Sequence, residues 1–140
     1  MLSGQLALVA AAVFTGAALY VSVCEQPARL LLDDRSLLAE WKPAYKRGAL
    51  MQAPLAMLGF LFGMIAWWET GNFAWAVGGV LIVANWPVTL LVIMPTNRQL
   101  MATETGGPES RTMILKWGKL HAIRTCLGFA ATVTFLLASV

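Results

Sequence analysis

Two apolar runs separated by a four-residue turn decide the fold of this chain. Residues 49–68 read ALMQAPLAMLGFLFGMIAWW and residues 73–94 read FAWAVGGVLIVANWPVTLLVIM, with ETGN between them at 69–72. A helix that spans a bilayer needs about 20 mainly apolar residues, and each run has that length. Because the turn is short, the two helices must be antiparallel neighbours. This stretch therefore predicts a transmembrane helical hairpin.

Two further apolar runs flank the hairpin, at about residues 6–23 and 120–140. The first run is too long for the apolar part of a cleaved signal peptide and has no Lys or Arg before it, so we expect a retained helix. With 59% hydrophobic and 12% charged residues, the chain is far more apolar than a soluble domain. The sequence predicts one all-α domain over residues 1–140, an integral membrane antiparallel four-helix bundle.

The basic residues predict the orientation of this bundle. All of them lie in or beside the connections expected at about residues 24–48 and 95–119, and none lies in the turn at 69–72. The positive-inside rule then makes both long connections cytoplasmic and both termini external, in a multi-pass protein of the cell (inner) membrane. Loop charge of this kind encodes orientation, so the net charge of +3 indicates a lipid bilayer as partner and no nucleic acid. An outer aromatic belt is expected at Trp67, Trp68, Phe73 and Trp75.

The two halves of the chain resemble each other. The first helix ends in PARL at residues 27–30 and the third in PTNRQL at 95–100. WKPAYKR at 41–47 precedes the second helix, and WGKLHAIR at 117–124 opens the fourth. These matches predict two repeated helix-hairpin halves related by an axis along the membrane normal. Residues 29–41 alternate apolar and charged side chains at helical spacing, which predicts an amphipathic helix on the inner surface.

Ionisable side chains in membrane helices are costly and usually face the bundle interior. Glu25 ends the first helix, Arg47 begins the second, and His121 and Arg124 lie in the first turns of the fourth. All four fall at the predicted cytoplasmic end. Trp117, His121 and Arg124 follow the i, i+4, i+7 spacing and therefore share one helix face. His121 is the only histidine, the side-chain type whose charge changes near neutral pH.

Two interpretations of this cluster are open. In the functional one, a polar pocket holds His121 as acid or base and Arg124 as the stabiliser of an anion. The residues expected to bind substrate there, by hydrogen bonds, charge or aromatic walls, are Glu25, Trp41, Tyr45, Arg47, Asn97 and Trp117. In the structural interpretation, Arg47 and Arg124 reach out to lipid phosphates, the tryptophans form an inner belt, and an arginine neutralises Glu25.

Cofactor motifs are absent from the sequence. A di-iron site in a bundle needs several glutamates and Glu-x-x-His motifs, and Glu25 is the one acid near His121. A single histidine excludes a bis-His haem, and there is no phosphate loop, dinucleotide fingerprint or nucleophile elbow. We therefore expect no metal and no cofactor. Cys24 and Cys126 are expected to be small buried apolar residues.

Four motifs together identify a family resemblance. They are Glu-x-Pro at 25–27, Trp-x-x-x-Tyr at 41–45, Pro-x-Asn-x-x-Leu at 95–100 and Trp-x-x-x-His-x-x-Arg at 117–124. The chain resembles the anthrone-oxygenase-like family of small four-helix membrane proteins over essentially its whole length, most specifically in the last two motifs. The resemblance implies oxidation of a lipophilic anthrone by dioxygen without metal or flavin. It further implies that His121 takes a proton from the substrate and that Arg124 stabilises the resulting anion.

Two other functions stay open as alternatives. A non-catalytic accessory subunit would use small residues for helix contacts with a second copy of the chain or with other membrane subunits. The small residues in question are Gly16, Ala17, Gly59, Gly63, Gly78 and Gly79. A carrier of a small lipophilic molecule would suit the repeat, but the absence of charged residues in the middle of the predicted spans counts against it.

Overall fold

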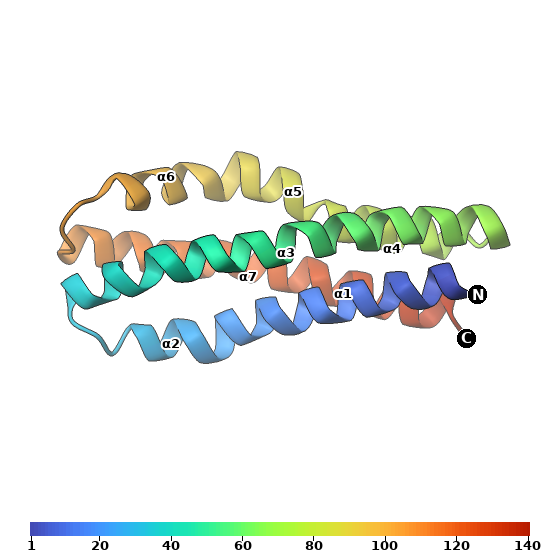
Figure 1. Ribbon diagram of the computed structural model, residues 1–140, viewed down its shortest axis with the longest axis horizontal. Coiled ribbons are helices and arrows are strands. Elements are labelled where there is room, and N and C mark those ends of the chain that lie inside the picture. The colour runs from blue at the N-terminus through green and yellow to red at the C-terminus, as the bar shows by residue number, and fades with distance from the viewer.

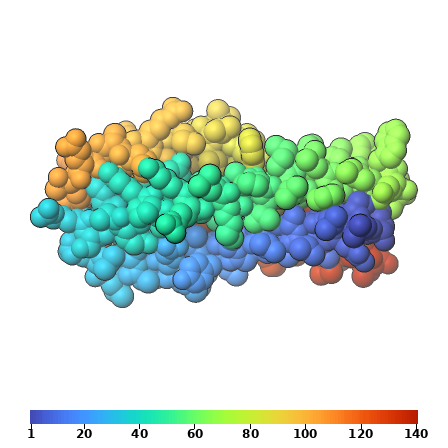
Figure 2. All heavy atoms as spheres, in the orientation of Figure 1, coloured from blue at the N-terminus to red at the C-terminus, as the bar shows by residue number.

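The protein is a bundle of four long helical rods, described by a computed structural model for all residues 1–140 (Figure 1). The rods are Leu2–Arg29, Asp34–Thr70, Phe73–Ala102 and Pro108–Ala138, and each is long and apolar enough to cross a membrane. There are no strands. The structure therefore confirms the predicted all-α architecture, and the bundle is an elongated body several times longer than a helix is wide (Figure 2).

The rods are subdivided by two π-helical segments and a break. The first contains α1 (Leu2–Tyr20), η1 (Val21–Glu25) and α2 (Gln26–Arg29), and the second is α3 (Asp34–Thr70). The third contains α4 (Phe73–Val83), α5 (Asn85–Val88), η2 (Thr89–Ile93) and α6 (Met94–Ala102), and the fourth is α7 (Pro108–Ala138).

The rods run antiparallel in chain order around a square. Both α1 and α4 pack against α3 and α7, so α1 and α4 lie on one diagonal. Both termini lie at one end, called here the terminal end, together with the turn between α3 and α4 (Figure 1). The connections at residues 30–33 and 103–107 lie at the opposite end, called the loop end.

The helices extend well beyond the ends predicted from hydropathy. The second helix was expected from residue 49 and the fourth from residue 120, whereas α3 begins at Asp34 and α7 at Pro108. The amphipathic segment expected on the inner surface is largely the first part of α3. At 37 residues, α3 is about 55 Å long, against a hydrocarbon thickness of about 30 Å. Hydropathy detects only the lipid-facing part, but the helix continues because its inward face still packs against its neighbours.

Capping residues mark both ends of α3 and the start of α4. The carboxylate of Asp33 accepts hydrogen bonds from the amides of Arg35 and Ser36 at 3.1 and 3.0 Å and thereby caps α3. The amide of Ser36 is the main reason that the pKa of Asp33 lies below its usual 3.8. At the other end of α3, Gly71 adopts a φ of 70°, which favours glycine, and Asn72 then caps α4.

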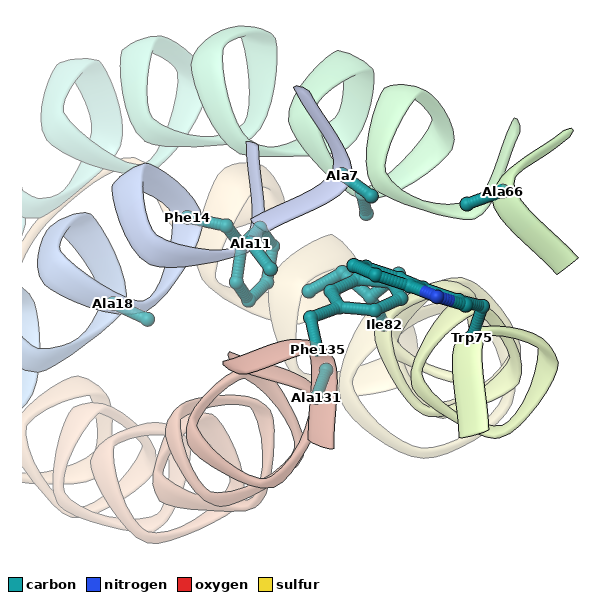
Figure 3. Close-up of a cluster of buried hydrophobic side chains, with 10 residues drawn as sticks. Ala7, Ala11, Phe14, Ala18, Ala66, Trp75, Ile82, Ala131 and Phe135 are labelled. Carbon is teal, nitrogen blue, oxygen red and sulfur yellow. The ribbon is translucent and has the colours of Figure 1, made fainter. Parts of the chain in front are cut away.

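The core of the terminal end is built around two aromatic rings. Trp75 of α4 and Phe135 of α7 lie with ring centroids 5.6 Å apart, and both are fully buried (Figure 3). Gly63 and Gly78 leave room for Phe135, because a Cβ atom on them would lie 2.9 and 2.5 Å from its ring atoms. Small residues thus bring the helices together, as is usual inside membranes.

Trp75 corrects the predicted aromatic belt. Only 1% of its surface is exposed, so it belongs to the core. Trp67, Trp68 and Phe73 are 36%, 88% and 65% exposed and do lie at the rim of the terminal end. Trp75 differs because it comes one turn into α4, where its side chain points inward and contacts the position of Gly4 on α1.

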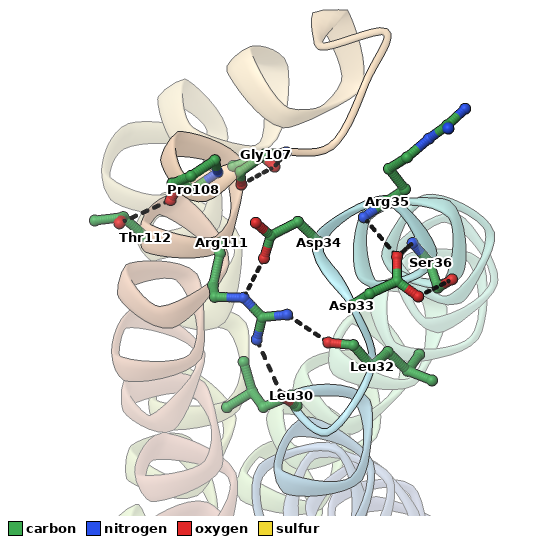
Figure 4. A network of polar contacts seen from close by, with 11 residues as sticks. Leu30, Leu32, Asp33, Asp34, Arg35, Ser36, Gly107, Pro108, Arg111 and Thr112 are labelled. Atoms are coloured by element: carbon green, nitrogen blue, oxygen red, sulfur yellow. Dashed lines mark hydrogen bonds and ion pairs between the residues drawn. The ribbon is translucent and has the colours of Figure 1, made fainter.

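At the loop end, one arginine fastens α7 to the connection between α2 and α3. The guanidinium of Arg111 donates a hydrogen bond to the carbonyl of Leu30 at 3.0 Å. It also donates to the carbonyl of Leu32 and pairs with the carboxylate of Asp34 (Figure 4). The first turn of α7 is therefore held beside the start of α3.

The two halves repeat in structure as well as in sequence. In each half a π-helical segment ends two residues before a proline: η1 before Pro27 and η2 before Pro95. Proline lacks an N–H and cannot complete the α-helical ladder, so the hydrogen-bond register changes there. The same change of hydrogen-bond register therefore occurs in the first and the third rod, in each case just before a proline.

The aromatic pairs of the two halves also match. Trp41 stacks on Tyr45 and Trp117 packs on His121, with ring centroids 4.9 Å apart in both pairs. The two tryptophans meet edge to face at 5.7 Å between the helices that carry them. Tyr45 and His121 thus occupy equivalent places on opposite sides of the bundle.

Candidate functional site

A small polar pocket lies inside the bundle, between its middle and the loop end, and all four rods contribute to it. Its cavity volume is about 30 Å³, which is room for one or two water-sized molecules. Six of the predicted site residues line it together: Glu25, Tyr45, Asn97, Trp117, His121 and Arg124. The structure therefore brings together side chains that are almost a hundred residues apart in sequence.

Two predicted substrate-binding residues do not line this pocket. Trp41 is fully buried one layer behind it, stacked in parallel on the ring of Tyr45. Arg47 is exposed on the outside of the bundle. It comes two residues after Tyr45, which places it about 200° further round the helix, so the two side chains cannot face the same cavity.

His121 is held by a short chain of hydroxyl groups. The ring is 4% exposed, and its Nδ1 lies 3.3 Å from the hydroxyl of Ser22 on η1. That hydroxyl lies 3.0 Å from the hydroxyl of Thr125, one turn further along α7. The face of Trp117 supports the ring from the other direction. A histidine oriented through one nitrogen presents the other nitrogen for proton transfer.

Arg124 is a largely enclosed cation without an acidic partner. Its Nη2 donates a hydrogen bond to Oε1 of Gln52 at 3.0 Å, and its guanidinium lies 5.6 Å from the ring centre of Phe14. Its Nε has no hydrogen-bond partner, and none of the ion pairs of the protein includes it. A guanidinium placed in this way can stabilise an anion that enters the pocket.

Arg29 has the opposite surroundings. It is 3% exposed and makes ion pairs with Glu25 at 3.1 Å and Glu40 at 3.0 Å. Its guanidinium also lies 5.6 Å from the ring centre of Trp117. The sequence left open which arginine pairs with Glu25, and the structure assigns Arg29.

Sequence reasoning missed two polar residues of the pocket, Arg29 and Gln52. Signals for both were present. Arg29 follows Glu25 by four residues, the spacing of a helical ion pair. Gln52 is the single amide side chain within the apolar run at 49–68, where a polar group needs an internal partner.

Several buried polar atoms facing this region have no partner. Asn97 is 1% exposed, and neither its Nδ2 nor its Oδ1 makes a hydrogen bond. The Nε1 of Trp117 is likewise unpaired. Leaving such a group unsatisfied costs about 1–3 kcal/mol, so each one indicates a place where a bound molecule would gain a hydrogen bond.

Two larger cavities continue outward from the polar pocket. The inner chamber, of about 190 Å³, lies between α3 and the α5–η2 segment and shares Tyr45, Ala49 and Arg124 with the pocket. The outer groove, of about 710 Å³, lies on the side of the bundle and shares Tyr45, Ala49, Ala53 and Trp86 with the chamber. The three cavities therefore form a series from the outer surface to His121. Of the residues that line the outer two cavities, the sequence analysis assigned only Tyr45 and Arg124 to a site.

The cysteines and acidic residues form no metal-binding group. Cys24 and Cys126 are both free, and the expectation that they are buried is wrong, because both lie on outward faces of their helices and are exposed. No three side chains of His, Cys, Asp or Glu come close enough together to hold a metal ion. The titratable and charged residues that line the polar pocket include one imidazole, His121, and one guanidinium without an acidic partner, Arg124.

Comparison with known proteins identifies the family. No curated protein and no solved structure matches the chain. A family model described as anthrone oxygenase matches residues 41–134, about two thirds of the chain. This span contains five of the six predicted residues that line the polar pocket, all except Glu25. The match confirms the resemblance found in the motifs, and the protein belongs to the anthrone oxygenase family.

Proposed function

We propose that the protein is a cofactor-independent oxygenase that acts on a lipophilic, hydroxylated aromatic compound of the anthrone type. The observation that carries this proposal is the pairing of His121 with Arg124, an enclosed cation that no acid neutralises. A base beside an uncompensated cation favours reactions in which a substrate loses a proton and becomes an anion. Family membership supports the same reaction class.

The reaction balances without a further redox partner. His121 takes a proton from the acidic methylene group, and Arg124 stabilises the resulting anion. The anion gives an electron pair to dioxygen, a carbon–oxygen bond forms, and the peroxide takes the proton back from His121. Loss of the second methylene proton then breaks the oxygen–oxygen bond. The products are a ketone in place of the methylene and one water, so one oxygen atom enters the product and the other leaves as water.

The remaining pocket residues position the substrate and the base. Ser22 orients the imidazole through Nδ1, and Trp117 supports its face. Asn97 offers a free donor and a free acceptor to oxygen atoms of a bound molecule. The ion pairs of Arg29 with Glu25 neutralise that part of the wall, so Arg124 stays the cation available to an anion.

Dioxygen uptake by the detergent-purified protein tests this function directly. We expect uptake with a panel of hydroxylated anthrones, one dioxygen consumed and one quinone formed per substrate. The His121→Ala variant should lose about 10²–10⁴-fold in rate, the usual contribution of a positioned base. Arg124→Gln should lower the rate as well, because the anion is then unsupported.

Cys126→Ser provides the matched control, since Cys126 is an exposed residue of the same helix and lines none of the three cavities. Its rate should equal that of the wild type, and the wild-type rate should survive a metal chelator. Uptake by the His121→Ala variant at the wild-type rate, or no uptake above buffer with any anthrone, would contradict the proposal. Loss of uptake with the chelator would contradict its cofactor-independent part.

A further inference from the structure

The polar pocket is too small for an aromatic ring. Its cavity volume of about 30 Å³ holds one or two molecules of the size of water. The inner chamber beside it has about 190 Å³, and an apolar protein cavity of about 150 Å³ is enough to bind benzene. A single aromatic ring therefore fits the chamber and not the pocket, and a larger ring system would extend into the outer groove, which shares walls with the chamber.

We infer that the inner chamber is a separate binding site for a planar aromatic molecule with a hydroxyl group, reached sideways from the bilayer, and that Asn85 selects for the hydroxyl. The inference rests on the proposed function where it takes this molecule to be the substrate. In that arrangement the rings lie in the chamber and the reacting methylene group lies where the chamber meets the pocket of His121, beside Tyr45 and Arg124, which line both compartments.

Asn85 provides the polar recognition. The residue is 1% exposed, and its Nδ2 donates a hydrogen bond to the carbonyl of Ile82 at 3.0 Å. This bond fixes the amide, because the reverse orientation would place two oxygens against each other. The free atom is therefore Oδ1, a buried acceptor without a partner in a chamber whose other walls are largely apolar. A hydroxyl donor on a bound molecule satisfies it, and a plain hydrocarbon does not.

Two more unpaired groups belong to residues that line the same chamber. The hydroxyl of Thr89 on η2 has no hydrogen-bond partner, and neither has the Nε of Arg124. Both groups can donate a hydrogen bond to an oxygen atom of the ligand. The chamber thus offers an acceptor in Asn85 and donors in Thr89 and Arg124, which suits a molecule that carries a hydroxyl group and a second oxygen.

The walls of the chamber suit a flat molecule. Ala49, Ala53 and Ala56 form the α3 side, and the aromatic rings of Tyr45 and Trp86 stand at its edges. Alanines leave a slot along the helix, and aromatic rings pack against the face or edge of another ring. The space exists because the third rod breaks at Ala84, between α4 and α5, and passes through η2.

The outer groove connects this chamber to the lipid. Trp86 lines both cavities, and its Nε1 donates a hydrogen bond to the carbonyl of Ala53 at 3.2 Å, from α5 across to α3. Ala53 lies about 27 Å along α3 from the turn at Gly71, close to the hydrocarbon thickness of about 30 Å. The groove therefore meets the bilayer near the level where hydrocarbon gives way to headgroups, with Lys46 on its wall. Amphipathic aromatic compounds collect at that level.

Photolabelling in phosphatidylcholine vesicles under nitrogen tests the inference without any turnover. The probes are a trifluoromethyl-diazirinyl phenol and the same compound without its hydroxyl, with insertion sites mapped by mass spectrometry. We expect the phenol to insert at chamber residues of α3, α5 and η2, about tenfold more than the compound without the hydroxyl, as one buried hydrogen bond predicts. Equal and diffuse labelling by both probes over lipid-facing residues would overturn the inference.

Three variants sharpen the test. Ala53→Leu fills the chamber and should abolish the preferential labelling, while Ala12→Leu, an exposed alanine of α1 outside the three cavities, should leave it intact. Asn85→Leu should make the two probes label equally. Ala53→Leu keeps the test decisive if Asn85→Leu does not fold. Preferential labelling that survives Ala53→Leu in a folded protein overturns the inference.

The labelling experiment and the dioxygen-uptake experiment can give opposite results, and each result bears on a different proposal. Preferential labelling of the chamber in a protein that consumes no dioxygen would support the binding site and contradict the proposed function. Dioxygen uptake that is unchanged in Ala53→Leu would support the function and contradict the assignment of the chamber as the substrate site.

Discussion

Two arginines that line the polar pocket show how strongly the surroundings decide what a residue does. Arg29 lies between Glu25 and Glu40 and over an aromatic ring, so the two carboxylates neutralise its charge within the protein. Arg124 contacts only the neutral side chain of Gln52 and an aromatic ring. Arg29 therefore links helices through ion pairs, whereas the charge of Arg124 is not neutralised by an acid and is available to a bound anion.

Removing the charge of Arg29 should destabilise the protein. In Arg29→Met, Glu25 and Glu40 lose their shared cation, and we expect a loss of about 2–4 kcal/mol, less than for a fully buried pair because both carboxylates are partly exposed. The measurement is the midpoint of thermal unfolding in detergent. Adding Glu25→Gln and Glu40→Gln to Arg29→Met should recover most of the loss. A single variant as stable as the wild type would show that the network contributes little.

Phe135 makes Gly78 hard to replace. A Cβ atom at Gly78 would lie 2.5 Å from the ring of Phe135, which Trp75 prevents from moving away. We expect Gly78→Ala to cost about 1–3 kcal/mol through overpacking, measured as a lower unfolding midpoint. Gly16→Ala is the control, because a Cβ atom there meets nothing within 4 Å. Equal midpoints for the two variants would contradict the packing argument.

At the level of elements, the third rod departs most from a regular helix. It breaks at Ala84, changes register through η2 and resumes as α6 at Met94. Its first part, α4, packs closely on α3 at Gly79 and on α7 at Gly78. Beyond the break, the inner chamber separates the rod from α3. The break is thus the structural cause of the cavity.

Arg111 is expected to hold the loop end together. Arg111→Gln removes the hydrogen bonds to two carbonyls of the connection and the ion pair with Asp34, which we expect to cost about 1–2 kcal/mol of local stability. Cleavage by proteinase K at residues 30–33 and 103–107 should then become about tenfold faster, because local opening governs proteolysis. Arg98→Gln should cleave like the wild type, since exposed Arg98 makes no ion pair. Equal cleavage of both variants would contradict the stabilising role of Arg111.

For the whole molecule, orientation in the membrane remains a prediction that labelling can test. Both termini lie at one end and the two connections at the other (Figure 1). With Cys24 and Cys126 replaced by serine, we expect an impermeant maleimide to label Val140→Cys on intact cells. Thr105→Cys should be labelled only after permeabilisation, because the basic residues gather at its end. The reverse pattern would place the polar pocket nearer the external side.

The sequence by itself determined the number of helices, their antiparallel course and six residues of the polar pocket. Apolar run length, a four-residue turn and helical spacing are local properties, and they can be read without knowing how helices pack. The family could be identified for the same reason, since its motifs are short and lie at helix ends.

Only the tertiary structure decided which charged residues pair with one another. That Glu25 pairs with Arg29, that Arg124 has no acid, and that Arg47 faces outward depend on how the helices are rotated against each other. The same holds for the inner chamber, which exists because the third rod breaks and shifts register beside α3. Rotation and separation of helices arise from contacts between residues far apart in the chain, so no local pattern in the sequence records them.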